Sequence, residues 1–271
     1  MLVVTGHHTA PALSTLARSA LLARAISPNG QTSCREPSRT MKYATAKHCQ
    51  NCPVQSLSLC NSLAHDELAE LNAFVTDSHY KNHDILFDQD TPANWVYIVT
   101  EGVVRLHKTL PDGRRLVLGF ALPGDFLGFS DCDVHATSAD ALGPVAICRI
   151  SREAFQNLLD AKPHLMRRLH AELIHEFTLA QDRLMLLGRG SAKERMAAFF
   201  VNMRNRWKRV NGQSANVALP MSRLDIADFL GLTIETVSRM VTTLARERLI
   251  VIVPDGIRIL DLPRLEAIAI G

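Results

Sequence analysis

The sequence predicts an α+β chain in which an antiparallel β-roll is followed by a long helix and a C-terminal winged helix-turn-helix. Short strand-like runs separated by turn residues fill residues 62–162. Apolar residues recur at helical spacing through residues 163–188. A helix–glycine–helix pattern occupies residues 224–244 and is followed by a hairpin pattern. Together these observations divide the chain into an N-terminal β half and a C-terminal helix-turn-helix half.

Length and composition set the limits of the prediction. A chain of 271 residues can form two moderate domains, and 47% apolar residues can fill their cores. The net charge of +3 does not by itself indicate nucleic-acid binding, but residues 193–209 carry a local excess of Lys and Arg. Apolar runs fall short of the ~18 residues that a membrane span needs, so we expect no membrane partner.

Residues 1–47 differ in kind from the rest of the chain. The first forty include a single acidic residue, Glu36, and many Ala, Ser, Thr and Arg. We expect a disordered tail there, rather than a transit peptide built on a weak amphipathic helix at residues 10–26. The informative sequence begins just after Met41, which makes Met41 a candidate translation start. The intact mass of protein from the native host would test this hypothesis.

Residues 48–61 form a loop that holds half of the cysteines of the chain. They follow the pattern Cys49-x2-Cys52-x7-Cys60. A C-x-x-C pair places two thiolates around one metal or cluster, and the third comes from the far side of a short loop. The spacing alone leaves three alternatives open: a zinc site with His48 as fourth ligand, an iron–sulfur cluster, and reduced thiols without metal. Structural disulfides are not expected in a cytosolic protein.

Residues 62–162 are predicted to form the β domain. A short helix is expected first, at residues 66–75, and the strand-like runs follow at regular intervals. Regular spacing of short strands and turns favours an antiparallel roll or barrel. The clearest strand-like runs are residues 95–99, 103–107 and 115–120, and the turn signals between them are residues 101–102, 111–113 and 123–125.

Residues 163–188 are predicted to form one long helix with an apolar stripe. The stripe could pack on the β domain of its own chain, but its length and heptad-like period favour a helix from a second subunit. We therefore expect a homodimer. Gly188 and Gly190 end the helix and provide a hinge before the next domain. The predicted dimer-interface residues are Met166, Leu169, Leu173, Phe177, Ala180 and Leu184, and the stripe continues to Leu187.

Residues 191–271 are predicted to form the winged helix-turn-helix. Ala227 is small enough for two helices to cross closely, and Gly231 most easily takes the positive φ that ends the first helix. Thr233 can cap the second helix, which buries Val237. Strand patterns at residues 216–219, 249–253 and 257–260, with a turn at residues 254–256, supply the wing, and residues 263–270 form a short last helix.

The exposed face of the second helix carries side chains suited to reading DNA. Glu235, Ser238 and Arg239 lie at i, i+3 and i+4 and therefore share one face. Arg239 can donate two hydrogen bonds to guanine, Glu235 can accept from a cytosine amine, and Ser238 can reach a base edge or a phosphate. The alternative is a solvated ion pair of little energetic value. Thr233 and Arg223 complete the candidate DNA-binding residues.

Residues 233–239 resemble the recognition helix of the CRP/FNR family of bacterial transcription regulators. The Glu-x-x-Ser-Arg pattern is similar to the FnrN/FixK-like, oxygen-responsive branch, and residues 193–200 resemble the family's entry into the DNA-binding domain. The resemblance extends over residues 48–262 and implies that a homodimer reads a TTGAT-type inverted repeat in double-stranded DNA and activates transcription. It also implies a cyclic-nucleotide-binding-like jelly roll and contact with RNA polymerase, for which the hairpin at residues 111–113 is a candidate.

The same resemblance bears on the cysteines. C-x2-C-x7-C is similar to the pattern of oxygen-sensing members of the FNR group, which implies a [4Fe–4S] cluster with a fourth cysteine from the β domain. Cys148, in the strand-like run 145–150, matches that fourth position. Cys132 lies between Asp131 and Asp133, whose charges oppose thiolate formation, and it matches no family ligand. Cys34 is likewise unassigned.

A cyclic nucleotide is not expected as a ligand. Binding in the CRP branch needs an Arg-Ser pair for the phosphate, and the matching region, residues 124–135, offers Asp131 and Asp133 instead. These carboxylates would repel a phosphate. The region also has no nucleophile–base pair or metal-ligand cluster, so no enzyme activity is expected.

The sequence therefore favours a cytoplasmic, oxygen-responsive regulator of anaerobic or microaerobic genes that dimerises on a [4Fe–4S] cluster. One alternative is a redox-responsive or zinc-stabilised CRP-family regulator without such a cluster. A second alternative, an iron–sulfur electron carrier or enzyme, is disfavoured because the helix-turn-helix pattern is complete and a catalytic set is missing.

Overall fold

The computed structural model describes residues 42–43, 49–130, 133–212 and 214–270. All of them belong to one compact unit, Arg39–Gly271. Most of the predicted tail, with Cys34 and Met41, lies outside the described residues. So do His48, Asp131 and Cys132.

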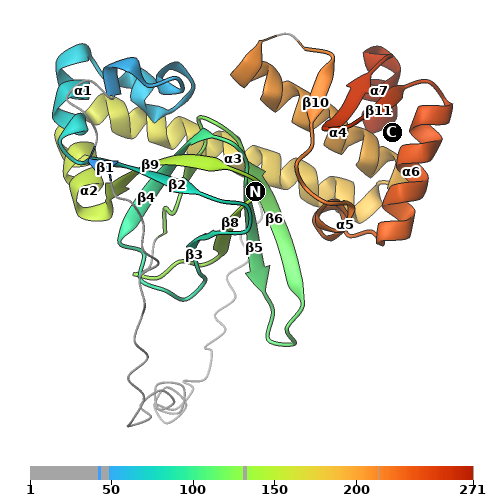
Figure 1. Ribbon diagram of the computed structural model, residues 1–271, viewed down its shortest axis with the longest axis horizontal. Helices are drawn as coiled ribbons and strands as arrows, with labels where there is room; N and C mark the ends of the chain where they lie inside the picture. Colours follow the sequence, from blue (N-terminus) through green and yellow to red (C-terminus); the bar gives the residue numbers. More distant parts are fainter. Residues whose placement is uncertain (1–41, 44–48, 131–132, 213, 271) are drawn as a thin grey trace, which may run out of the picture. The chain divides into compact units, whose positions relative to one another are not determined.

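The β-roll consists of two antiparallel sheets, which confirms the predicted fold class (Figure 1). The five-stranded sheet has the order β1-β2-β9-β4-β7, and the four-stranded sheet has the order β3-β8-β5-β6. Because β1 pairs with β2, its residues belong to the roll and not to the tail predicted for residues 1–47. The strands are β1 Lys42–Tyr43, β2 Val75–Tyr80, β3 Ile85–Phe87, β4 Trp95–Glu101, β5 Val104–Thr109, β6 Arg115–Ala121, β7 Phe126–Leu127, β8 Ser138–Ala141 and β9 Val145–Ser151.

The cysteine loop folds into three short 3-10 helices that precede α1. These are η1 Cys49–Asn51, η2 Gln55–Leu57 and η3 Leu59–Ser62, and α1 is His65–Asn72. The helix predicted for residues 66–75 thus ends three residues early, which corrects its C-terminal boundary. The physical reason is that Val75, a β-branched residue, begins β2 and pairs with Ile150 of the central strand β9.

The β5–β6 hairpin is positioned by its turn. Thr109 pairs with Arg115, and Leu110 donates its N–H to the Arg114 carbonyl at 2.8 Å. Gly113 takes φ of 82°, a conformation that glycine adopts without steric cost. The hairpin therefore forms around the turn predicted at residues 111–113 and brings β5 and β6 side by side.

Helices α2 Arg152–Ala161, α3 Pro163–Arg189 and α4 Ala192–Asn211 follow the roll. The Ser151 side chain caps α2 by accepting from the Ala154 N–H at 3.2 Å. Gly190 ends α3, as predicted, whereas Gly188 lies inside the helix. Ser191 caps α4 in a reciprocal capping box with Glu194. Among the described residues, none of the helices is long and apolar enough to cross a membrane.

The C-terminal domain is the predicted winged helix-turn-helix. Its sheet has the order β10-β12-β11, with every pair antiparallel. Gly256 begins β12 at a close crossing, because a Cβ atom there would lie 2.1 Å from the Val217 carbonyl oxygen. The elements are β10 Asn216–Ala218, α5 Arg223–Leu230, α6 Ile234–Arg246, β11 Ile250–Val253, β12 Gly256–Ile259 and α7 Leu262–Ile270.

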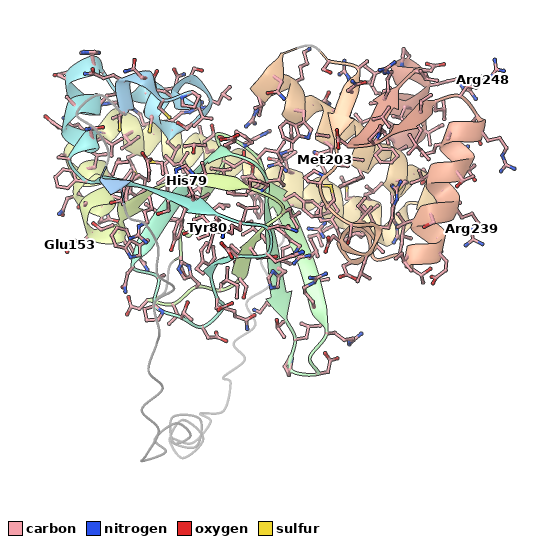
Figure 2. All side chains as sticks on the ribbon, in the orientation of Figure 1. His79, Tyr80, Glu153, Met203, Arg239 and Arg248 are labelled. Carbon is pink, nitrogen blue, oxygen red and sulfur yellow. The ribbon has the colours of Figure 1, made fainter. Side chains whose placement is uncertain are left out.

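The turn between α5 and α6 has the predicted chemistry. Gly231 adopts the left-handed conformation, with φ of 61°, and donates to the carbonyl of Ala227, which is buried. The Thr233 hydroxyl accepts from the Thr236 N–H at 3.2 Å and so caps α6. Arg239 projects outward from the middle of α6 (Figure 2).

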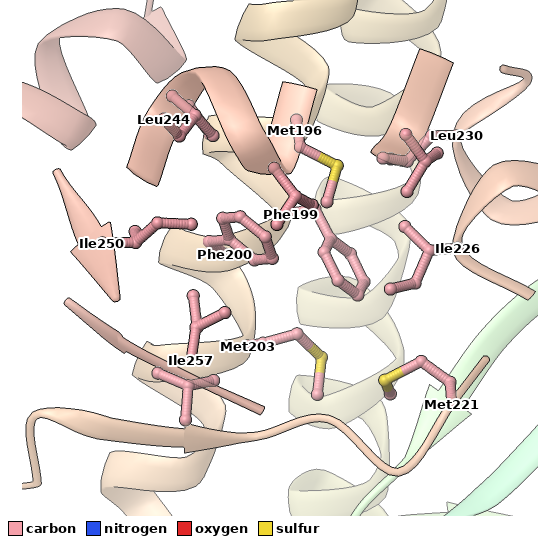
Figure 3. Close-up of a cluster of buried hydrophobic side chains, with 14 of the residues drawn as sticks. Met196, Phe199, Phe200, Met203, Met221, Ile226, Leu230, Leu244, Ile250 and Ile257 are labelled. Carbon is pink, nitrogen blue, oxygen red and sulfur yellow. The ribbon is translucent and has the colours of Figure 1, made fainter. Parts of the chain in front are cut away.

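The core of this domain is apolar and closely packed (Figure 3). Phe200 of α4 lies at its centre and is fully buried, with Ile226 of α5, Leu244 of α6 and Ile250 of β11 around it. Full burial of one such side chain stabilises a fold by about 1.5–3 kcal/mol. Side chains of α4, α5 and the wing therefore pack against the buried side of α6 and fix its position in the domain.

Candidate functional site

The outer face of α6 presents the predicted DNA-reading side chains to solvent. Glu235, Ser238 and Arg239 are all exposed, whereas Val237 and Val241 on the opposite face are buried. The Arg239 Nη2 donates to the Thr236 hydroxyl at 3.2 Å, which holds the guanidinium against the helix. The helix period predicted this separation of faces, and the structure confirms it.

The remaining DNA-binding candidates lie at the starts of the two helices. Thr233 is exposed at the N-cap of α6, and Arg223 is the first residue of α5 and is half-buried. Burial lowers the pKa of the Arg223 guanidinium. The pKa of Glu235 is also lowered, because its carboxylate accepts from its own backbone N–H and from the Thr233 hydroxyl. Glu235 is therefore an ionised acceptor at neutral pH.

The Lys and Arg excess of residues 193–209 is largely used within the protein. Lys193 Nζ contacts both carboxylate oxygens of Glu247 at 2.8 Å. Arg206 donates to the Phe120 carbonyl at 2.6 Å and pairs with Asp125. The sequence showed this excess as a local run of positive charge beside the predicted DNA-binding domain. In the structure, these two cations instead join α4 to α6 and to the roll.

Four cysteines line one small cavity at the N-terminal end of the roll. Cys49 lies in η1, Cys52 follows it, Cys60 lies in η3, and Cys148 comes from the middle of β9. Cys49 and Cys148 are buried, and Cys52 and Cys60 are half-buried. The other lining residues are Ser58, Leu71 and Ile98. The structure thus brings the distant Cys148 to the three cysteines of the loop.

The position of Cys148 is fixed by the central strand of the larger sheet. Its Cα partners are Asp77 on β2 and Ile98 on β4, so both neighbouring strands hold it in register. A slip by one residue would turn its side chain to the other face of the sheet. Cys132 and Cys34, which the sequence left unassigned, lie outside the described residues.

The thiols of the cavity have raised pKa values. Burial, followed by the charges of Cys60 and Cys52, raises the pKa of Cys49 to about 12. Burial raises the pKa of Cys60 to about 11 and that of Cys148 well above its usual value. Thiolates crowded into an apolar cavity need a compensating positive charge, and metal ligation supplies one with loss of the thiol protons.

The donor set fits a thiolate-ligated iron–sulfur cluster. Such clusters are held by four cysteine thiolates, and the cavity provides four, with the apolar side chains of Leu71 and Ile98 beside them. A zinc ion would require its ligands to converge within about 2.3 Å of one point. Within the described ranges, no group of three or more His, Cys, Asp or Glu side chains is arranged to hold a metal ion, and this applies to zinc and to a cluster alike.

Two polar side chains that sequence reasoning missed support the cysteine loop. Asn72, the last residue of α1, accepts from the Cys49 N–H at 3.2 Å. Ser58 is buried, and its hydroxyl accepts from the Cys60 N–H at 3.3 Å. Ser58 lies two residues before Cys60 and caps the short helix η3. A search of the C-x7-C segment for serine residues able to cap a helix could therefore have found it. Asn72 carried no local signal.

Aromatic rings fill the interior of the roll. The ring of His135 stacks on Phe87 with centroids 4.0 Å apart, and Phe87 stacks on Tyr97 at 5.2 Å. All three side chains are buried. Burial, followed by the charge of Arg152, lowers the pKa of His135 and favours its neutral form. The part of the interior around these rings is apolar and aromatic.

The apolar stripe of α3 divides into two parts. Phe177 and Leu184 are 64% and 69% exposed, and Met166, Leu173 and Ala180 are exposed as well. Leu169 corrects the prediction, because it is only 3% exposed and packs in the core of its own chain. The first turns of α3 lie against the roll and the cysteine loop. The predicted interface with a second subunit therefore excludes Leu169.

The fold and the exposed face of α6 together define a class of protein. It is a transcription regulator with a β-roll, a long helix and a winged helix-turn-helix. Two family models match the chain. Residues 77–162 match the cyclic nucleotide-binding domain, and residues 194–268 match the Crp-like helix-turn-helix domain. The chain belongs to the CRP/FNR family.

Relatives and a solved structure agree with this assignment. The chain is 47% identical to the transcriptional activatory protein AadR of Rhodopseudomonas palustris, over 81% of this chain and 92% of AadR. It is 43% identical to the nitrogen fixation regulation protein FixK of Bradyrhizobium diazoefficiens, over 86% of this chain and 99% of FixK. FixK2 of Bradyrhizobium japonicum is 34% identical, with a TM-score of 0.67, over 72% of this chain and 96% of that structure. The chain is thus a DNA-binding transcription regulator and not an enzyme.

Proposed function

We propose that this regulator responds to oxygen through a [4Fe–4S] cluster and, as a dimer, controls anaerobic or microaerobic genes. The observation that carries the proposal is the cavity in which Cys49, Cys52, Cys60 and Cys148 meet. When bound there, a cluster supplies an oxygen-labile bridge between the N-terminal loop and β9. The chain's own residues determine how the state of that bridge reaches the rest of the molecule.

The cavity shares a hydrophobic cluster with the beginning of α3. Cys49 and Cys148 pack in the same cluster as Leu59 and as Leu165 and Leu169 of α3. A change in the loop would therefore alter the support of α3 directly. We infer that loss of the bridge loosens this support and weakens pairing of the exposed α3 stripes in two subunits. A free-energy change of about 1.4 kcal/mol shifts such an equilibrium tenfold.

The DNA site is proposed to be a TTGAT-type inverted repeat. The exposed Arg239 and Glu235 have the donor and acceptor groups for a guanine and a cytosine of each half-site, and Ser238 lies beside them. A two-fold dimer would place two α6 helices in successive major grooves. A protein that reads chromosomal DNA in this way would act in the cytoplasm, and the β5–β6 turn at residues 111–113 is our candidate contact for RNA polymerase.

The test is purification with and without oxygen. Protein purified anaerobically should be straw-brown, contain iron and acid-labile sulfide in equal amounts, and bind the inverted repeat. Exposure to air should bleach the colour and release the DNA in parallel. Colourless anaerobic protein that binds the repeat equally well in air would refute the proposal.

A zinc-stabilised or thiol-based regulator is the second candidate. The raised pKa values of the four thiols show that, without a metal, they are protonated at neutral pH. Stoichiometric zinc in colourless protein would support a zinc site, and metal-free protein whose DNA binding follows thiol reduction would support the redox alternative. For either form we propose no cyclic-nucleotide ligand, because the described interior of the roll around Phe87, Tyr97 and His135 is filled by stacked aromatic rings.

A further inference from the structure

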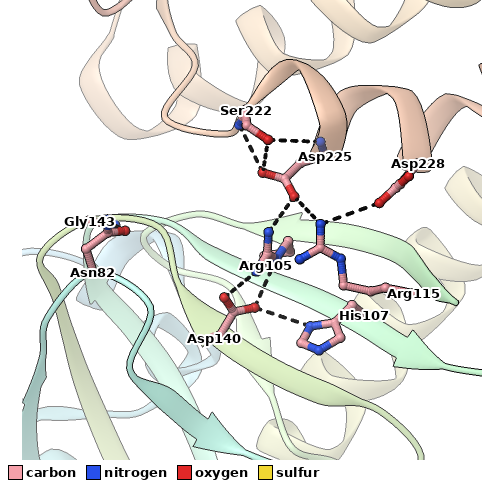
Figure 4. Close-up of polar contacts among 9 residues, drawn as sticks. All are labelled: Asn82, Arg105, His107, Arg115, Asp140, Gly143, Ser222, Asp225 and Asp228. Carbon is pink, nitrogen blue, oxygen red and sulfur yellow. Dashed lines mark hydrogen bonds and ion pairs between the residues drawn. The ribbon is translucent and has the colours of Figure 1, made fainter. Parts of the chain in front are cut away.

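A buried network of charged side chains joins the roll to the first helix of the helix-turn-helix (Figure 4). Arg105 of β5 donates to Asp140 of β8 through Nε at 3.0 Å and Nη2 at 2.6 Å. Its remaining nitrogen, Nη1, donates to Asp225 of α5. Arg115 of β6 donates through Nη2 to Asp225 at 2.8 Å and to Asp228 at 3.4 Å. Two arginines of the roll thus contact two carboxylates of α5.

The central members of this network are shielded from water. Arg105, Asp140 and Asp225 are each less than 10% exposed. A buried charge is costly unless it is paired, so these three groups depend on one another. The other oxygen of Asp225 accepts from the Ser222 N–H at 2.9 Å and from the Ser222 hydroxyl at 2.7 Å. One carboxylate therefore caps α5 and anchors the helix to the roll.

A third arginine adds α3 to the same contact. Arg183 donates to the carbonyl of Val117 in β6 at 3.1 Å and to that of Phe229 in α5 at 2.8 Å. Its guanidinium also lies 3.9 Å from the centre of the Phe229 ring. Directional contacts thus meet at one place and join three elements: α3 with its exposed stripe, the β5–β6 hairpin and α5.

We propose that Arg105, Arg115 and Asp225 are positioning residues that set the orientation of the helix-turn-helix for DNA binding. In the orientation that they hold, Glu235, Ser238 and Arg239 all remain exposed. Apolar contacts allow sliding. The charge-assisted hydrogen bonds that Arg105 and Arg115 donate to Asp225 fix direction as well as distance, and the two-bond contact with Asp140 holds the Arg105 guanidinium in place for them. A dimer needs this fixed direction, because its two α6 helices must match the spacing of two half-sites. The inference therefore rests on the proposed reading of an inverted repeat.

The experiment measures discrimination between half-site spacings. The probes are duplexes that carry two inverted half-sites with the natural spacer or with the spacer changed by one or two base pairs, and the full-length protein is used. Arg115→Ala should lower affinity for the natural spacing about fivefold or more and flatten the preference among spacings. Arg115→Lys, which keeps the charge and can still pair with one carboxylate, should restore much of the preference.

Arg114 provides a matched control on the same hairpin. Its side chain is 78% exposed and pairs with Asp112 across the turn, whereas that of Arg115 is 30% exposed. Arg114→Ala removes the same charge and should keep the spacing preference of the unaltered protein. Equal preference in Arg114→Ala and Arg115→Ala would overturn the positioning role. An unaltered protein that treats all spacings alike would contradict the inverted-repeat proposal instead.

Hydrogen exchange without DNA tests the contact independently of any binding site. Arg115→Ala should speed amide exchange in α5 and in the facing strand β6, and Arg114→Ala should leave it unchanged. If exchange in α5 is the same in both variants, the network does not hold the domain and the inference fails. Thermal unfolding of both variants confirms that they remain folded.

Discussion

In α6, the side chains proposed to read DNA come from one short stretch, Glu235 to Arg239, and all of them are exposed. In the cysteine cavity, three of the proposed ligands come from one loop, and the fourth, Cys148, comes from a strand in the middle of the roll. To form the α6 face, the chain needs only a helix whose opposite side is buried in the domain core. The cavity needs the loop, α1 and three strands in register.

The difference shows how each site can respond to its surroundings. The face of α6 is exposed to solvent. Its proposed contacts form only when DNA is bound, and salt screens the charged ones. The cavity is lined by buried and half-buried side chains, so a change in its thiols alters the packing around it. A surface site is suited to recognition, and a buried site that joins distant segments is suited to sensing.

Removing the distant ligand should have the largest effect. Cys148→Ala, purified without oxygen, should lose the iron–sulfur absorbance and nearly all DNA binding, as should alanine variants of Cys49, Cys52 and Cys60, because a four-cysteine cluster needs each ligand. Absorbance and gel-shift measurements on the same samples check this. Cys132→Ala is the control and should keep both signals. An intact cluster in Cys148→Ala together with loss in Cys132→Ala would move the fourth ligand to Cys132.

A charge on the exposed stripe of α3 should separate the subunits. Leu173→Glu places a carboxylate in the proposed apolar seam, where an unpaired buried charge costs several kcal/mol. Sedimentation of the anaerobic protein should show a shift from dimer to monomer. Ala171→Glu adds the same charge two residues away, on the opposite side of the helix, and should leave the dimer intact. An undisturbed Leu173→Glu dimer would show that the seam lies elsewhere.

Truncating one reading side chain should cost less. Arg239→Ala should weaken binding to the specific site by roughly 1–3 kcal/mol and binding to random DNA much less, because it removes a bidentate base contact. Titrations of both duplexes at fixed salt give the ratio. Arg248, also exposed and shown beyond the end of α6 in Figure 2, supplies the control. Arg248→Ala removes the same charge and should weaken both affinities alike. An unchanged ratio in Arg239→Ala would reject this reading face.

The smallest expected effect is a pH dependence at the start of α6. The pKa of Glu235 is lowered in the folded protein by its own backbone N–H and by Thr233. Its carboxylate therefore contributes stability that is present above the unfolded pKa and is lost as pH falls through the lower folded value. Thermal unfolding without DNA should show Glu235→Gln slightly less stable near neutral pH and equal to the unaltered protein in acid. A difference that grows in acid would contradict this assignment.

The sequence by itself determined the features that depend on local periodicity and on special backbone conformations. The reading face followed from the helix period around Val237, and the turn followed from Gly231, whose positive φ of 61° is costly for other residues. The end of α3 at Gly190 and the turn at residues 111–113 followed from the same local chemistry. The family resemblance supplied Cys148 as the fourth cysteine, which its spacing from the loop could not.

Only the tertiary structure decided which residues meet. Leu169 belongs to the α3 stripe by period, but the cysteine loop and the roll bury it, and no local signal distinguishes it from Leu173. Asp225 is a capping residue by its spacing from Ser222, and its pairing with Arg105, 120 positions away, is set by how the domains pack. Local propensity acts through neighbours along the chain, whereas burial and charge pairing depend on distances in space, which the folded chain alone determines.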